Sequence, residues 1–150
     1  MHVYQTRKAF DAELSSVKKW VRCGQALDLA SGLQRDVAYS TGDSLVYWWD
    51  EAASLAASDF VGHRRYLSVL SPIDGGLAVE IAPKSALQAI KPYSDLTDRE
   101  RFAGAGERTV VQAGGVLVVD IDEAFRIPAD QRVKAVVIHV TVEGYSFPNK

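Results

Sequence analysis

Two of the three histidines stand in contexts where an imidazole could take part in acid–base chemistry. His63 belongs to Gly62-His63-Arg64-Arg65-Tyr66, a polar cluster next to apolar residues. His139 lies in the apolar run 133–142, where the two-residue period of a strand puts it on one face with Val137. An imidazole can accept or donate a proton near neutral pH. The alternatives are a strand-entry histidine at position 63 and a hydrogen-bonded core histidine at position 139.

Carboxylates supply the other half of a candidate acid–base set. Asp120 and Asp122 close the apolar segment 116–121 and would share one face of a strand there. A pair of carboxylates can act as acid and base in glycosidases, although two acids at the end of a strand are more often part of a turn. Glu80 would share its face with Ala78 and Ala82, and such small neighbours leave room for a ligand.

The residues that follow His63 could recognise a ligand. Arg64, Arg65 and Tyr66 could form the rim of an anion- or sugar-binding mouth, because an arginine can bind a carboxylate through two parallel hydrogen bonds. The alternative is that both arginines are solvated at the start of a strand. No phosphate loop, G-x-S-x-G or H-E-x-x-H motif is present, so the sequence carries no strong catalytic signature.

Composition limits the class of protein. The 150 residues are 47% apolar and 24% charged, which predicts a single globular domain over residues 1–150. Seventeen basic residues against 19 acidic ones give a net charge of −2, which argues against nucleic-acid binding. Cys23 is the single cysteine and is expected to be buried and structural. No signal peptide or membrane span is expected, and the predicted location is the cytoplasm.

The first 30 residues have the spacing of a helix. Phe10, Leu14 and Val21 recur with a helical period, which predicts a helix that packs an apolar stripe on a sheet. The alternative is a helix that docks a partner. Thr6 is the expected N-cap, and the expected end is Gly24 or Gly32.

After Gly32 the pattern becomes that of strands. About eight short strands separated by turn residues predict a mainly β sandwich or closed barrel rather than parallel βαβ units. The charged run 94–101 is expected to be a solvated loop or a single helical turn. The expected strands are 37–39, 45–49, 66–70, 77–81, 87–90, 109–111, 116–121 and 133–142.

Several strings, in this order, resemble one known family over essentially the whole chain. The family is YhcH/YjgK/YiaL, and the closest match is its evolved β-galactosidase β-subunit (EbgC) branch. The strings are Lys18-Lys19-Trp20, Gly42-Asp43-Ser44-Leu45, Gly62-His63-Arg64-Arg65-Tyr66, Thr97-Asp98-Arg99-Glu100, Gly104-Ala105-Gly106-Glu107, Asp120-Ile121-Asp122-Glu123-Ala124-Phe125-Arg126, Val140-Thr141-Val142-Glu143-Gly144-Tyr145 and Asn149-Lys150.

The resemblance implies a cupin-like double-stranded β-helix, a jelly-roll barrel with an N-terminal α-helix. It also implies a cytoplasmic protein of carbohydrate metabolism. Members of the family include the small subunit of a β-galactosidase and proteins tied to sialic acid anomer interconversion or to biofilm regulation. Several are thought to hold a divalent metal, zinc or similar, in the barrel.

The chain departs from the family at the expected metal ligands. Ser68 and Leu70 stand where the branch has an acidic residue and a histidine, and Asp122 replaces another histidine. His139 stands where relatives usually have lysine. Loss of the metal is therefore expected, because zinc needs three or four converging ligands. The fallback ligand set is His63, Glu80, Asp122 and His139.

The leading hypothesis is an accessory subunit of a large glycosidase, with little or no catalysis of its own. A mouth lined by Arg65, Tyr66, Glu80, Asp122 and Arg126 would take a sugar or a sugar acid. Of the adjacent Trp48 and Trp49, one is expected at a surface that meets a partner chain.

The alternative hypothesis is an independent sugar anomerase or mutarotase. His63 or His139 would then pair with Glu80 or Asp122 as acid and base, and Arg64 or Arg65 would hold a sugar carboxylate. A homodimer without a ligand is a third class. A homo- or hetero-oligomer is expected in each case.

Overall fold

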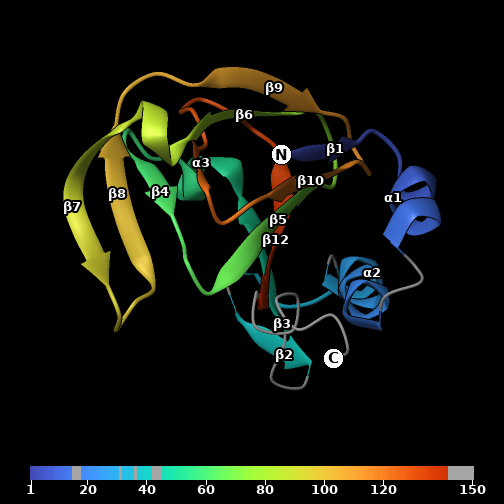
Figure 1. Cartoon of the computed structure of the whole chain (residues 1–150). Coiled ribbons are helices and arrows are strands. Elements are labelled where there is room, and N and C mark those ends of the chain that lie inside the picture. The colour runs from blue at the N-terminus through green and yellow to red at the C-terminus, as the bar shows by residue number, and fades with distance from the viewer. Residues whose placement is uncertain (15–17, 31, 36, 42–44, 142–150) are drawn as a thin grey trace.

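A computed structural model of the chain describes residues 1–14, 18–30, 32–35, 37–41 and 45–141. Two six-stranded antiparallel sheets face each other, and helices α1 and α2 lie to one side of them (Figure 1). Sheet A has the order β1 (His2–Tyr4), β10 (Val116–Val119), β5 (Tyr66–Pro72), β12 (Lys134–Thr141), β3 (Leu45–Glu51), β2 (Tyr39–Thr41). Sheet B has the order β7 (Gln88–Ser94), β8 (Arg99–Ala103), β4 (Phe60–Gly62), β11 (Glu123–Arg126), β6 (Leu77–Pro83), β9 (Glu107–Val111). The helices are α1 (Arg7–Leu14), α2 (Lys18–Ala30), α3 (Ala52–Leu55) and the 3₁₀ turn η1 (Lys84–Ala86).

The chain alternates between the two sheets. It runs from β3 in sheet A to β4 in sheet B, back to β5 and on to β6, and it repeats the alternation through β10, β11 and β12. Antiparallel strands that alternate in this way between facing sheets make a cupin-like double-stranded β-helix, or jelly roll. The expected fold class is confirmed.

Sheet A carries apolar side chains on both faces, since the helices cover one face and sheet B covers the other. In β5, Leu67 and Val69 face the helices, while Leu70 faces sheet B. The core between sheet A and the helices includes Phe10 and Trp20, whose rings meet edge to face with centroids 6.2 Å apart. The N-terminal helical region therefore packs on the sheet as its apolar stripe predicts.

The helical region differs in detail from the single helix expected. Thr6 is the N-cap of α1, since its hydroxyl accepts the backbone N–H of Ala9 at 3.1 Å. A second helix, α2, follows; Gly24 lies inside it, and Gly32 lies just beyond its end. Cys23 is fully buried, and burial raises the pKa of its thiol to about 12. No helix among the described residues combines the length and the apolar character needed to cross a bilayer.

Only residues 95–98 of the charged run 94–101 form the expected turn, and the rest of the run belongs to strands. β7 ends at Ser94, and β8 begins at Arg99 after a turn in which Asp98 has a φ of 52°. β8 pairs with β4 on one side and with β7 on the other, so its charges alternate between two faces of a sheet. Strands β1, β4 and β11 are further elements not expected from the sequence. Residues 42–44 and 142–150, which belong to the strings that carry the family resemblance, lie outside the described residues.

Candidate functional site

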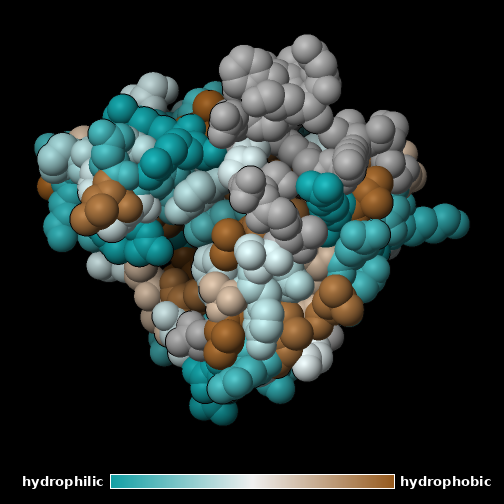
Figure 2. Space-filling view, turned by 90° about the horizontal axis from the view of Figure 1, so that it is seen from below, coloured by the Kyte–Doolittle hydropathy of each residue, from teal (hydrophilic) through white to brown (hydrophobic). Residues whose placement is uncertain are grey.

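A cavity of about 310 Å³ lies between the two sheets. Sheet A contributes Trp48 and His139, and sheet B contributes Val61, Arg101 and Phe125. Seen from below, the molecule is hollowed between its mainly hydrophilic left-hand part and its centre (Figure 2). Ligand pockets commonly measure ~300–1,000 Å³, so this cavity can hold a small molecule.

Strand register explains why His139 faces the cavity. β12 pairs with both β3 and β5, and in these ladders His139 lies opposite Val46 and Ser68. Because strand side chains alternate, His139 shares its face with Val137, which lines the same cavity. The expected grouping of these two residues is confirmed.

Four aromatic rings cluster beside the cavity: Trp48, His63 and His139 line it, and Tyr66, which was expected at its mouth, packs on the two histidines without lining it. The His63 and His139 ring centroids are 5.1 Å apart, and Tyr66 stacks on His139 with centroids 4.0 Å apart. Trp48 meets the His139 ring edge to face at 4.9 Å. His63 comes from the segment between β4 and β5, and His139 comes from β12, so the fold brings together two histidines that are far apart in the sequence.

The structure defines the tautomer and charge of His63. Its Nδ1 lies 2.7 Å from the backbone carbonyl oxygen of Asp98. A carbonyl only accepts, so Nδ1 carries the proton and Nε2 keeps its lone pair. Burial lowers the pKa of His63. Burial is the main reason that the pKa of His139 is lowered to about 3, and the electrostatic effects of His63 and Arg99 lower it further. Both imidazoles are therefore neutral at neutral pH.

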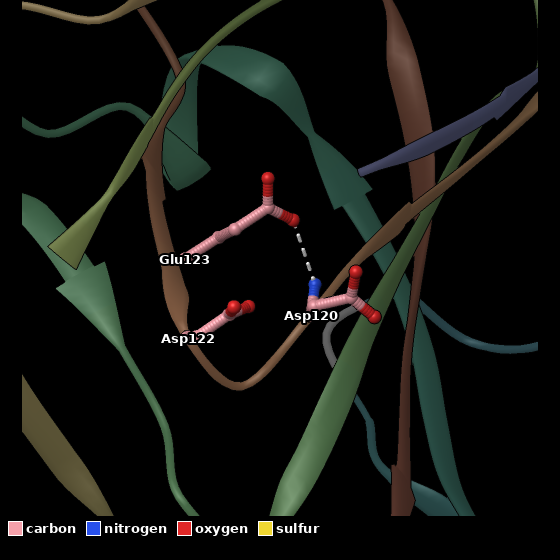
Figure 3. Close-up of side chains that lie close together, drawn as sticks. All are labelled: Asp120, Asp122 and Glu123. Carbon is pink, nitrogen blue, oxygen red and sulfur yellow. Dashed lines mark hydrogen bonds between the residues drawn. The ribbon is translucent and has the colours of Figure 1, made fainter.

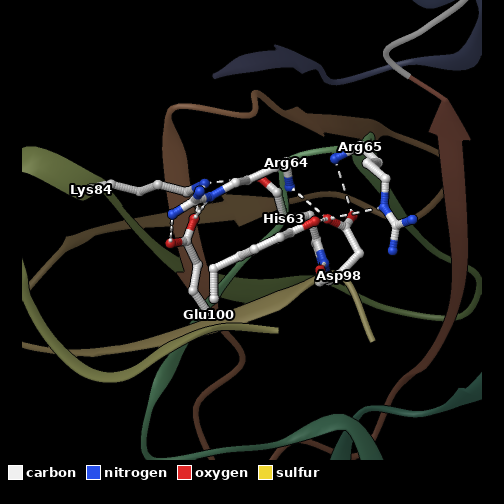
Figure 4. Close-up of polar contacts among 7 residues, drawn as sticks. His63, Arg64, Arg65, Lys84, Asp98 and Glu100 are labelled. Carbon is white, nitrogen blue, oxygen red and sulfur yellow. Dashed lines mark hydrogen bonds and ion pairs between the residues drawn. The ribbon is translucent and has the colours of Figure 1, made fainter. Parts of the chain in front are cut away.

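A network of charged residues holds the segment that carries His63 (Figure 4). The Asp98 carboxylate, which is almost fully buried, accepts the backbone N–H groups of Arg64 at 3.2 Å and Arg65 at 3.1 Å. Burial alone would raise the pKa of Asp98, but hydrogen bonds from the Tyr93 hydroxyl and these two N–H groups lower it. The carboxylate therefore holds the backbone directly after His63.

Arg64 and Arg65 do not line the cavity. The Arg64 guanidinium donates to Glu100 at 3.0 and 3.3 Å, and Arg65 donates to the Asp95 carbonyl oxygen at 2.5 Å. Lys84 donates to the same Glu100 carboxylate at 2.6 Å. The structure therefore does not place these two arginines at the expected rim of this cavity, because their guanidinium groups bind Glu100 and the Asp95 carbonyl oxygen; a role in ligand binding stays a prediction.

Glu80 and Arg126 form a pair at sheet B. They are opposite each other in the β6–β11 ladder, and Arg126 Nε lies 2.5 Å from Glu80 Oε1. In β6 the residues that face the inter-sheet core are Val79 and Ile81, so Glu80 faces the other way. Arg126 lines the cavity, whereas its ion-pair partner Glu80 does not. The expected face of Glu80, shared with Ala78 and Ala82, points away from the cavity.

Asp122 lies in the turn between β10 and β11, away from the histidines. Its carboxylate forms a cluster with those of Asp120 and Glu123, in which one ligand atom of each lies within 4.8 Å of the others (Figure 3). The Met1 ammonium contacts Asp120 at 3.2 Å and Glu123 at 2.6 Å. Because β10 ends at Val119, the two aspartates do not continue its strand face as expected.

The four proposed catalytic residues thus do not converge on one point. His63 and His139 share the cavity, whereas Glu80 and Asp122 lie outside it. Their catalytic assignment remains a prediction. The positions of these residues also limit where a metal ion could bind. Within the described parts of the chain, the one group of three possible ligands that lie close together is the carboxylate cluster of Asp120, Asp122 and Glu123. Its oxygens could hold a hard divalent cation.

The cavity does not fit the metal that the resemblance implies. Ser68 and Leu70 face the cavity side of β5 where ligands are expected. The two imidazoles and the Asp59 carboxylate line the cavity, but among the described residues they do not form a group of ligands within reach of one another. A tetrahedral zinc site takes three or four His, Cys or carboxylate ligands.

Two further cavity residues, Arg99 and Arg101, were not predicted as site residues. They were part of the charged run 94–101. The signal that could have found them is the alternation in Arg99-Glu100-Arg101-Phe102, in which every second residue is an arginine.

No known protein-family profile matches the chain. In structure it is similar to the protein NMB1881 from Neisseria meningitidis at 14% identity and a TM-score of 0.42, over 72% of this chain and 87% of that one. It is also similar to hydroquinone 1,2-dioxygenase from Sphingomonas sp. TTNP3, with 4-hydroxybenzoate bound, at 14% identity and a TM-score of 0.47, over 77% and 71%. The hydroquinone 1,2-dioxygenase PnpCD, in complex with Cd²⁺ and 4-hydroxybenzonitrile, matches at 14% identity and 0.44, over 76% and 69%. The cupin-like assignment of this chain rests on its own strand topology.

Proposed function

We propose that the protein is a sugar anomerase and a divergent member of the YhcH/YjgK/YiaL family. The observation that carries this proposal is the meeting of two neutral imidazoles, His63 and His139, at the wall of a small cavity. The cavity combines apolar and aromatic surface with a few polar groups, as sites for small molecules do.

The chemistry needs one proton to move between two oxygens. His63 Nε2 accepts the proton of the anomeric hydroxyl as the bond between the anomeric carbon and the ring oxygen breaks. The imidazolium then returns the proton to the former ring oxygen. Both oxygens are bonded to the same carbon in the cyclic sugar, so one imidazole can serve both. Closure on the other face of the carbonyl is the reverse of these steps and gives the other anomer.

The other groups at the cavity wall hold the sugar in place. His139 offers a second imidazole that can hydrogen-bond a sugar oxygen. Trp48, which packs against His139, supplies an aromatic surface to the cavity. The Asp98 carbonyl oxygen keeps the proton on Nδ1 of His63 and so leaves Nε2 available as the base.

The accessory-subunit hypothesis has less support from the structure. Both Trp48 and Trp49 are half-buried, and Trp49 Nε1 donates to the Leu33 carbonyl oxygen at 2.7 Å. Both side chains are therefore partly exposed, and whether either one meets a partner chain stays a prediction. A large glycosidase partner stays a prediction, and co-purification of the two chains is its test.

The proposed activity can be measured by NMR exchange between the α and β anomers of glucose, galactose and the corresponding uronic acids. We expect exchange for at least one of these sugars to be faster with the protein than without it. His2→Gln is a matched control for substitutions at the cavity histidines, because His2 is exposed. An unchanged exchange rate for every sugar would contradict the proposal.

Glu80→Gln tests whether the outer face of sheet B contributes to activity or only to stability. We expect the free energy of unfolding to fall by about 1 kcal/mol or less, because a partly exposed ion pair contributes little. Anomer exchange should be unchanged, since Glu80 faces away from the cavity. Urea denaturation and NMR exchange on the same sample measure both. A large loss of exchange with normal unfolding would show that Glu80 acts in the site.

A further inference from the structure

Lys84 approaches the segment that carries His63 from the left in Figure 4, and Asp98 lies to the right of it. Lys84 is the first residue of η1, directly after β6. Its ammonium donates to the backbone carbonyl oxygen of His63 at 2.8 Å and to the Glu100 carboxylate at 2.6 Å. The lysine therefore contacts the residue that carries the proposed base, although it does not line the cavity.

Neutralisation of Glu100 does not account for this position of Lys84. The Arg64 guanidinium already donates to the Glu100 carboxylate at 3.0 and 3.3 Å, so the three side chains carry two positive charges and one negative charge. Only 18% of the Lys84 side chain is exposed, so its ammonium has lost much of its contact with water. A partly buried charge is unfavourable unless it is hydrogen-bonded. The His63 carbonyl oxygen supplies the second acceptor that compensates this loss.

Gly62 leaves the space through which the Lys84 side chain reaches this carbonyl oxygen. A Cβ atom at position 62 would lie 2.6 Å from Lys84 Cε and 3.3 Å from Lys84 Nζ. The first distance is too short for a contact between two carbon atoms, which prefer a separation of about 3.5–4.0 Å. Any larger residue at position 62 would therefore displace the end of the lysine side chain.

His63 is thus held at two different atoms. Lys84 holds the backbone carbonyl oxygen, and the Asp98 carbonyl oxygen accepts the proton of Nδ1 on the ring. The first contact fixes the orientation of the peptide group that follows His63, and the second fixes the rotation of the imidazole. The second contact depends on the first, because a rotation of this peptide group would move the ring away from Asp98.

We infer that Lys84 is a positioning residue for His63, because its hydrogen bond to the His63 carbonyl oxygen keeps the imidazole aligned with Asp98 and Nε2 directed at the ligand. The inference rests on the proposed function in taking His63 to be the base. Displacement of a catalytic group by about 1 Å can cost about 10²-fold in rate, so a contact that only orients the base affects turnover strongly. Since Lys84 does not line the cavity, binding of the sugar should not depend on it.

Lys84→Met tests this inference, because methionine keeps an unbranched apolar side chain beside Gly62 but has no donor. Gly62→Ala is a second route to the same effect, since it retains the ammonium and displaces it. Lys8→Met is the matched control, because Lys8 is exposed on α1 and does not line the cavity. Anomer exchange at varied sugar concentration gives kcat and KM. Nitrogen-15 NMR of the histidine ring nitrogens at neutral pH reports the tautomer of His63.

We expect Lys84→Met and Gly62→Ala each to lower kcat by about 10- to 100-fold and to leave KM nearly unchanged. In the unaltered protein, the spectrum of His63 should show the proton on Nδ1 and an unprotonated Nε2. Both variants should shift this spectrum toward a mixture of the two tautomers. Lys8→Met should change neither kcat nor the spectrum.

An unchanged kcat and an unchanged tautomer in both variants would overturn the inference, even if urea unfolding showed a loss of stability, because Lys84 would then only support the fold. If Lys84→Met does not fold, Gly62→Ala decides the question, since it retains the charge. Failure of the proposed function has a different signature. No anomer exchange by the unaltered protein would contradict the anomerase, and the nitrogen-15 spectra would still show whether Lys84 sets the tautomer of His63.

Discussion

His63→Gln is expected to slow the protein-catalysed exchange of sugar anomers by about 10²–10⁴-fold, which is the usual contribution of a general acid–base group. Glutamine keeps a polar side chain of similar reach but cannot take up the proton of the anomeric hydroxyl. The hydrogen bond from Nδ1 to the Asp98 carbonyl oxygen can be replaced by the glutamine amide N–H, so the segment keeps its anchor. NMR exchange at saturating sugar measures the effect.

The pH profile distinguishes a base from a residue that only supports the fold. Burial lowers the pKa of His63 below its ordinary value of 6.5. Activity should therefore fall on the acid side with a midpoint below pH 6.5. His2→Gln should retain the whole profile. An activity of His63→Gln close to that of the unaltered protein would rule out this residue as the base.

Acid is expected to destabilise the protein at a higher pH than its carboxylates alone would cause. The pKa of His139 is about 3 in the folded protein against 6.5 for an unperturbed histidine. The unfolded chain therefore binds more protons below pH 6.5, and stability is lost as the pH falls through the interval from 6.5 toward 3. His139 alone removes about 1.4 kcal/mol per pH unit within this interval, or about 2–3 kcal/mol between pH 6.5 and pH 4.5.

His139→Phe isolates this effect because phenylalanine keeps an aromatic ring against Tyr66 and Trp48 but has no proton to bind. Urea unfolding between pH 7 and pH 5 should show a shallower loss of stability for the variant. Asp98 and Glu100 also have lowered pKa values, but the ordinary values for these groups are 3.8 and 4.5. Their contribution is lost mainly below this range. Equal slopes for the variant and the unaltered protein would show that His139 does not titrate as described.

Alternation along a strand predicted some placements well and left others open. His139 and Val137 could be assigned to one face because β12 is central in sheet A and its register is set by two neighbours. The same argument grouped Glu80 with Ala78 and Ala82 correctly. It could not tell which face of sheet B points inward, because small residues also occur on the outer face. The pairing of Glu80 with Arg126 depends on strand order, which local sequence does not determine.

The charged run 94–101 shows a second limit. Charges usually indicate a solvated loop, and this expectation ignores what pairing with neighbouring strands can impose. β8 is held between β4 and β7, so its backbone is extended despite its charges. The aromatic contact between His63 and His139 joins segments far apart in the sequence. The sequence grouped the two histidines in one candidate set with Glu80 and Asp122 but could not show which members of the set meet. The resemblance to a known family supplied the cupin-like arrangement that connects them.

The turn between β7 and β8 unites two properties of the cavity. Asp98 at this turn provides the backbone carbonyl oxygen that accepts the Nδ1 proton of His63, and the next residue, Arg99, lines the cavity. One short hairpin thus sets the tautomer of the cavity histidine and places a positive charge beside it. The first contact uses a main-chain atom, so substitutions that preserve the turn would keep it, whereas a substitution of Arg99 by a neutral residue would remove the charge alone.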